Sequence, residues 1–167
     1  MYYKKIQKEV KAWTDYNFPQ AEPWQPLLGI VEEIGEYQDS YTVLEQEDAL
    51  ADAMIYLIDF ANKMEIDLDS DLGKPTASSY PEDYLRSMGK LSHAYLKKVQ
   101  SIRTEEDHDE NIKLALVNLM TRIRHSWAIF CANDSMFVDF ESVFRNVWKL
   151  VSQRDWQKYK ERGEQYD

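Results

Sequence analysis

The stretch from residue 27 to residue 62 constrains the fold most, because it sets acidic side chains among apolar ones at helical spacing. It reads LLGIVEEIGEYQDSYTVLEQEDALADAMIYLIDFAN. Residues three and four apart share one face of an α-helix, so the acids on each helix project together. Two such helices packed side by side would gather these carboxylates at one place: Glu32, Glu33, Glu36, Asp48 and Asp52.

Carboxylates held this close repel one another and shift one another's pKa values unless a proton or a cation intervenes. No Cys or His accompanies the acids in this stretch. Ligands that are all oxygen favour hard cations, so we expect Mg²⁺ or Mn²⁺ and not zinc or copper. A glutamate-rich helix is most often only a solvated face. Here, however, the acids interrupt an apolar stripe and a second acidic pair follows them, which favours a metal site.

Composition and charge narrow the class of protein. The chain has 167 residues, of which 44% are hydrophobic, with only five Gly and five Pro, which suits one helical globular domain. A net charge of −10 argues against a nucleic acid or an anionic membrane surface as partner. The only cysteine, Cys131, cannot form an internal disulfide, so we expect a cytoplasmic setting. No apolar run approaches the roughly 20 residues that a membrane helix needs.

Apolar periodicity predicts an all-α helical bundle, with no alternating run that would indicate a strand. A polar break is expected at residues 45–47, and the Ser, Gly and Pro content of residues 67–83 predicts a linker. The expected inward face of the second helix comprises Leu27, Leu28, Val31, Ile34 and Gly35. That helix should pair antiparallel with the third, so that Glu36 faces Asp48 and Asp52. The expected helices span residues 2–15, 24–41, 48–64, 84–103, 109–132 and 139–160. The apolar stripes expected to face inward are Leu50, Met54, Leu57, Ile58 and Ala61 in the third helix, Leu85, Met88, Leu91, Tyr95 and Val99 in the fourth, and Ile112, Leu116, Leu119, Ile123, Trp127 and Phe130 in the fifth.

The two halves of the chain align as copies of one helical hairpin. Leu28-Gly29 falls on Met88-Gly89, and the sequence FAN at residues 60–62 falls on CAN at residues 131–133. In this alignment the apolar frame persists while every acid is replaced, by Ser92, His93, Leu96, Leu119 and Ile123. We therefore expect a single domain over residues 1–167 built from two tandem degenerate hairpins. The half at residues 1–68 would hold the metal, and residues 80–167 would complete the fold without acids.

At these residues the chain resembles the MazG-like all-α nucleoside triphosphate pyrophosphohydrolases, which include dimeric dUTPases and dCTPases. The family's Glu-Glu-x-x-Glu run matches Glu32-Glu33-Ile34-Gly35-Glu36. Its second acidic pair usually has Glu three residues before Asp, whereas here Ala49 takes that place and Asp48 stands four before Asp52. The resemblance implies an enzyme that converts a nucleoside triphosphate to the monophosphate and pyrophosphate. It implies catalytic roles for Glu32, Glu33 and Glu36 and Mg²⁺ ligation by Glu33, Glu36, Asp48 and Asp52.

The resemblance also suggests residues that contact the substrate. Asn62 matches a family asparagine that contacts the nucleotide. The segment LKKVQSIR resembles a family segment whose cations bind phosphate, which implies that role for Lys97 and Arg103. Trp24, like Trp13 and Phe18, flanks the acidic hairpin and could stack on a base, although aromatic residues at helical spacing are more often core. The sequence RDW at residues 154–156 reads as a simple cap.

Two other readings stay open. A regulatory protein that keeps the acids to bind a Mg²⁺-nucleotide would bind without turnover, and the shifted Asp48 is the feature that favours it. A structural helical adaptor would keep its function in Glu36→Gln and Asp52→Asn variants. The sequence does not choose the base or the sugar, and it leaves a homodimer open.

Overall fold

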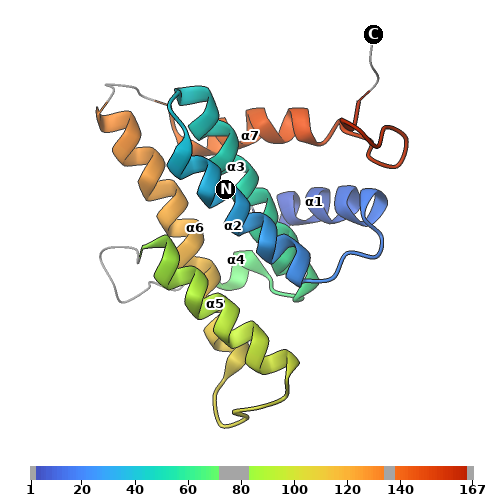
Figure 1. Ribbon diagram of the computed structural model, residues 1–167, viewed down its shortest axis with the longest axis vertical. Coiled ribbons are helices and arrows are strands. Elements are labelled where there is room, and N and C mark those ends of the chain that lie inside the picture. Colours follow the sequence, from blue (N-terminus) through green and yellow to red (C-terminus); the bar gives the residue numbers. More distant parts are fainter. Residues whose placement is uncertain (1–2, 72–82, 134–137, 165–167) are drawn as a thin grey trace. The chain divides into compact units, whose positions relative to one another are not determined.

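The computed structural model describes residues 3–71, 83–133 and 138–164. These residues form helices and no strand, so the all-α prediction is confirmed (Figure 1). Residues 72–82, which make up most of the expected linker, lie outside the described residues. The helices are α1 (Tyr3–Asn17), α2 (Trp24–Asp39), α3 (Val43–Lys63), α4 (Leu68–Asp71), α5 (Tyr84–Val99), α6 (His108–Asn133) and α7 (Phe140–Val151).

The chain divides into two compact units that differ from the expected halves. One unit combines residues 1–65 with residues 138–167, and the other spans residues 66–137. Helix α7, which the sequence division assigned to the second half, thus belongs with α1, α2 and α3. The reason is its apolar face, which packs within the first unit and buries Phe140, Val143, Phe144, Trp148 and Val151.

Helix α3 is the centre of the first unit and contacts α1, α2 and α7 (Figure 1). Its predicted apolar stripe is confirmed, because each of its members is fully shielded from solvent. A helix with neighbours on three sides buries most of its circumference, and α3 accordingly buries most of its residues from Ala49 to Ala61. The stripe consists of Leu50, Met54, Leu57, Ile58 and Ala61.

The predicted inward face of α2 is partly wrong. Leu28 is 60% exposed and Val31 is 52% exposed, while Gly35 also faces solvent. The buried apolar side chains are Leu27, Ile30 and Ile34. Apolar residues occupy two overlapping stripes on this helix, and spacing alone does not tell which stripe faces the core.

The predicted start of α3 and the predicted end of α7 are also wrong. The expected break at residues 45–47 lies inside α3, which begins at Val43 because Thr42 and Glu45 form a capping box. The Thr42 hydroxyl accepts a hydrogen bond from the Glu45 amide at 3.2 Å, and the Glu45 carboxylate accepts one from the Thr42 amide at 2.9 Å. The last helix ends at Val151 and not near residue 160. The chain then turns, and the Asp155 amide donates to the carbonyl of Gly163 at 2.6 Å.

The second unit contains a hairpin of α5 and α6, which lie side by side (Figure 1). The expected stripe of α6 is confirmed as far as Trp127, since Ile112, Leu116, Leu119 and Ile123 are fully buried as well. On α5, Leu85 and Val99 were expected to face inward, but they are 84% and 62% exposed. Helix α5 also stops at Val99 and not at residue 103.

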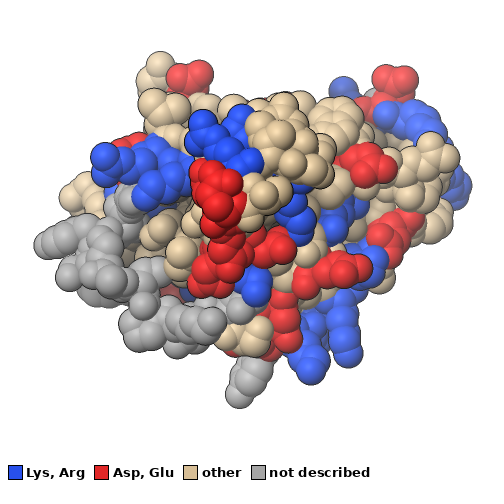
Figure 2. All heavy atoms as spheres, turned by 90° about the horizontal axis from the view of Figure 1, so that it is seen from below, with Lys and Arg blue, Asp and Glu red and all other residues tan. Residues whose placement is uncertain are grey.

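Figure 2 shows the charged side chains on one face of the protein. Among the described residues on that face, acidic and basic side chains lie interspersed (Figure 2). Within the described ranges, no helix combines the length and apolarity that crossing a bilayer requires.

Candidate active site in the first helical hairpin

The first hairpin holds its two helices in close contact. Helices α2 and α3 are joined by the three residues 40–42 and run antiparallel. At Gly29 the approach is so tight that an added Cβ would lie 2.6 Å from Cε1 of Tyr56. Four residues further along α2, and four residues back along α3, the antiparallel register brings Glu33 toward Asp52.

Glu33 is the inner acid of α2. Its side chain is half-buried, whereas Glu32 and Glu36 on either side are exposed. Burial raises the pKa of Glu33 to about 8, because the ionised carboxylate loses hydration. Nearby negative charges contribute to the same rise, in decreasing order Asp52, Glu36, Glu32 and Asp48. The fold therefore brings all five predicted acids into one electrostatic neighbourhood.

Asp52 is the inner acid of α3. Burial raises the pKa of its carboxyl to about 6, the charges of Asp48 and Glu36 add to the rise, and the positive charge of Arg154 opposes it. Its Oδ1 atom is buried and has no hydrogen-bond partner among the described residues. A buried carboxylate oxygen without a donor is costly unless something compensates it. This oxygen of Asp52 could therefore ligate a cation.

The five acidic side chains have the chemistry that a hard divalent cation prefers, but their positions in this structure do not assemble a metal site. All five side chains are carboxylates, the ligands that Mg²⁺ prefers. Among the described residues, however, no three Asp, Glu, His or Cys side chains stand close enough together to hold a metal ion. Glu32, Glu36 and Asp48 are exposed, so their side chains can change rotamer without disturbing packing. Movement of these outer acids toward Glu33 and Asp52 would complete the set.

Tyr56 and Arg154 belong to this neighbourhood, and the sequence reasoning missed both as site residues. Burial raises the pKa of Tyr56 to about 12, and the charges of Glu33, Glu32, Asp52 and Asp59 add to the rise. Its phenol therefore stays neutral beside the acids. The signal for Tyr56 was available, because it follows Asp52 by four residues on the same helical face. Arg154 had no such local signal, since it follows α7 and reaches the site only through the fold.

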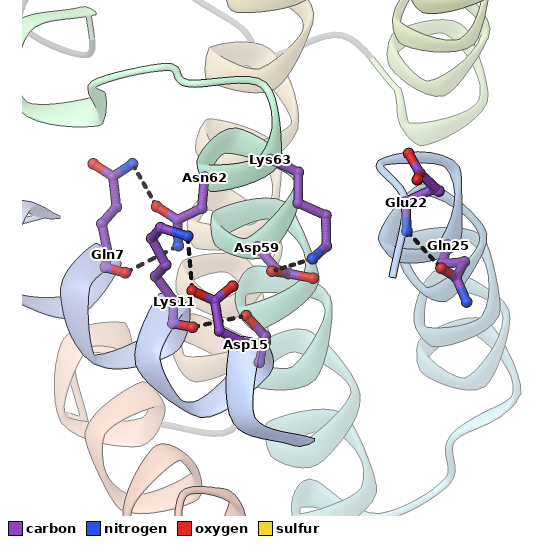
Figure 3. Close-up of polar contacts among 9 residues, drawn as sticks. Gln7, Lys11, Asp15, Glu22, Gln25, Asp59, Asn62 and Lys63 are labelled. Carbon is purple, nitrogen blue, oxygen red and sulfur yellow. Dashed lines mark hydrogen bonds and ion pairs between the residues drawn. The ribbon is translucent and has the colours of Figure 1, made fainter. Parts of the chain in front are cut away.

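Asn62 is placed away from the acids. It stands ten residues beyond Asp52 on α3, which is about 15 Å along a helix. Its amide is tied to α1: Oδ1 accepts from Nε2 of Gln7 at 3.2 Å, and Nδ2 donates to the Gln7 carbonyl at 2.9 Å (Figure 3). Close by, Nζ of Lys63 pairs with Oδ1 of Asp59 at 3.5 Å (Figure 3). In this structure Asn62 joins α1 to α3, and its predicted nucleotide contact stays a prediction.

The other predicted substrate residues are divided between the units. Trp24 opens α2, where its side chain is 50% exposed. Lys97 and Arg103 lie in the second unit, which contains none of the five acids. There Nζ of Lys97 approaches Oε1 of Gln100 at 3.5 Å, and Arg103 pairs with Glu106 at 3.6 Å. Their predicted phosphate contacts stay predictions.

Comparison of the chain with protein-family models, with curated proteins and with solved structures finds no match in any of the three. The resemblance to MazG-like pyrophosphohydrolases therefore depends on the sequence motifs alone.

Proposed function

We propose that this protein is a Mg²⁺-dependent nucleoside triphosphate pyrophosphohydrolase. The observation that carries the proposal is the pair of half-buried acids, Glu33 and Asp52, which two tightly packed helices hold near each other against their mutual repulsion. Such an arrangement costs stability in the protein alone, so its presence favours a cation as the compensating charge. The packing of Gly29 against Tyr56 fixes the spacing of the helices that carry the two acids.

In this proposal Glu33, Glu36, Asp48 and Asp52 hold the cation. When bound, Mg²⁺ would neutralise charge on the phosphate oxygens and lower the pKa of the attacking water. Glu32 would orient that water and accept its proton. The water oxygen bonds to the α-phosphorus as the bond from that phosphorus to the bridging oxygen breaks. Pyrophosphate leaves with the electron pair, and the nucleoside monophosphate remains.

A panel of ribo- and deoxyribonucleoside triphosphates tests the proposal. With the full chain and Mg²⁺, we expect phosphorus NMR to show monophosphate and pyrophosphate in equal amounts for at least one substrate. Excess EDTA should abolish both products, since a triphosphate with about four negative charges is repelled by bare carboxylates. Inorganic phosphate as the first product, or full activity in EDTA, would contradict the proposal.

The second candidate is a regulatory protein that binds a Mg²⁺-nucleotide without splitting it. It is favoured by the finding that no three of the described acids are assembled around a common point. The same panel separates the two functions. Saturable, Mg²⁺-dependent nucleotide binding with no product from any substrate would support the regulator.

A further inference from the structure

A cavity of about 140 Å³ lies in the first unit beside the acids, and the metal chemistry does not use it. Helix α1 contributes Trp13 and Thr14 to its lining, Phe18 follows directly after that helix, and α3 contributes four residues that begin with Asp52. The remaining wall comes from the end of α7 and the segment after it. Asp52 therefore borders both the acid cluster and the cavity.

Aromatic rings form a large part of the lining, beside the polar side chains of Thr14, Asp52, Asp59 and Arg154. The rings come from three different parts of the chain and are supplemented by the aliphatic Ile55 and Val151. Trp13 is held in place by edge-to-face contacts with Phe18 and Trp148, whose ring centroids lie 5.7 and 5.9 Å away. A flat apolar ring gains both burial and stacking in such surroundings. The aromatic residues that line the cavity are Trp13, Phe18, Tyr56 and Trp156.

The size of the cavity limits what it can hold. In another protein, a cavity of about 150 Å³ lined by apolar side chains holds one benzene molecule. A cavity of 140 Å³ thus has room for one six-membered ring, and the second ring of a purine would have to extend beyond it. Because Asp52 and Arg154 both line it, a ring inside would have a cation and the acid cluster next to it. That is where the charged part of a nucleotide would extend.

The segment after α7 forms the closing wall and is fastened to α1. Nε1 of Trp13 donates to the Arg154 carbonyl at 3.0 Å. The Trp156 amide donates to Oδ1 of the buried Asn17 at 2.7 Å, and Nε2 of Gln157 donates to the Asn17 carbonyl at 2.6 Å. These bonds fix the Trp156 ring at the cavity, so its bulk sets the available space.

We propose that this cavity binds the base of a pyrimidine nucleotide and that Trp156 determines specificity by limiting the base to one ring. The proposal deepens the proposed function, because it names the substrate class of the same site. It needs only binding, however, and therefore can be tested without turnover.

Equilibrium binding of deoxynucleoside monophosphates in Mg²⁺ tests it, followed by tryptophan fluorescence or calorimetry. These ligands lack the anhydride bond, so nothing is consumed during the measurement. We expect dCMP, dUMP and dTMP to bind about tenfold or more tighter than dAMP and dGMP. The order should persist in EDTA, where all affinities fall. Equal affinity for both classes would overturn the proposal.

Variants of the lining separate the role of ring size from general damage. Trp156→Ala should strengthen purine binding and weaken pyrimidine binding, a gain that unfolding cannot produce. Tyr41→Ala, which removes an aromatic side chain that is 96% exposed and absent from the lining, should leave the preference unchanged. Ile55→Phe fills the cavity and should abolish pyrimidine binding while the melting temperature is retained. Parallel weakening of both classes in Trp156→Ala, or unchanged binding in Ile55→Phe, would overturn the proposal.

The outcomes for the two proposals are distinguishable. Pyrophosphate release without a preference for pyrimidines leaves the proposed function standing and rejects the cavity as the base site. A pyrimidine preference in binding, with no hydrolysis of any triphosphate, supports the cavity and rejects the pyrophosphohydrolase.

Discussion

The two helical hairpins of this chain differ in the residues at their aligned inner positions. In α2 and α3 the inner positions include Glu33 and Asp52, whose pKa values are raised to about 8 and about 6. In α5 and α6 the positions aligned with Asp48 and Asp52 are Leu119 and Ile123, both fully buried. A hairpin of this kind therefore packs without acids. Acids that cost stability and are not required for packing indicate a function in the first hairpin.

The largest expected effect comes from placing an acid in the hairpin that lacks them. Ile123 is fully buried, so Ile123→Asp would place a carboxylate in an apolar core without a partner. We expect the free energy of unfolding to fall by about 4 kcal/mol or more. Urea denaturation measures this loss. Ile123→Val is the control for the change in volume, and it should lower the free energy of unfolding by about 1 kcal/mol. A loss no larger than that of the control would show that the second hairpin tolerates acids as the first does.

Removing one charge from the first hairpin should reduce activity strongly and keep the fold. In Asp52→Asn the side chain keeps its shape but loses the charge that would hold a cation. We expect the rate of pyrophosphate release to fall about a hundredfold or more. Glu47→Gln is the matched control, because Glu47 lies on the same helix and is not among the charges that act on Glu33 or Asp52. Equal loss in both variants would argue against a specific site.

Glycines at aligned positions should respond in opposite directions. At Gly29 a Cβ would press on the Tyr56 ring, whereas at Gly89 nothing lies within 4 Å. Gly29→Ala should therefore destabilise the protein by about 1–3 kcal/mol through overpacking. Gly89→Ala should stabilise it by about 0.5–1 kcal/mol, since alanine is the better helix former. Thermal melting measures both, and stabilisation by Gly29→Ala would contradict the close approach of α2 and α3.

The smallest effect is a pH dependence of stability in EDTA. The pKa of Glu33 is raised from 4.5 to about 8 on folding, so the folded protein binds the proton more tightly than the unfolded chain does. This contribution is complete below pH 4.5 and is lost as pH rises toward 8. Since the carboxyl is only half-buried and solvent screens it, we expect a loss on the order of 1 kcal/mol. Glu33→Gln should flatten the profile in this range, and an unchanged slope would contradict the assignment.

The sequence predicted best where neighbouring helices surround the predicted helix. The stripe of α3 with Leu50, Met54 and Leu57 was correct, because α1, α2 and α7 bury most of the circumference of this helix. On α2 two apolar stripes overlap, and Leu28 and Val31 were assigned inward although they are exposed. The choice between such stripes depends on the neighbouring helices, which periodicity does not contain.

The acids were likewise predictable from local spacing, and their partners were not. Glu33 and Asp52 come together because the apolar spacing predicts both helices and the connection between these helices is short. Trp156 and Arg154 reach the cavity only because Asn17 and Trp13 fasten the last segment to α1. Those contacts join residues about 140 positions apart, as the separation of 139 between Asn17 and Trp156 shows. No local sequence pattern predicts these long-range contacts.

The most direct test of the central claim is a titration of the metal-free protein with Mn²⁺, followed by electron paramagnetic resonance of the free ion. The account predicts saturable binding by the wild-type chain that is lost in Asp52→Asn and in Glu36→Gln but kept in Glu47→Gln. Mn²⁺ binding that is absent from the wild-type chain, or that persists unchanged in the Asp52→Asn and Glu36→Gln variants, would contradict it.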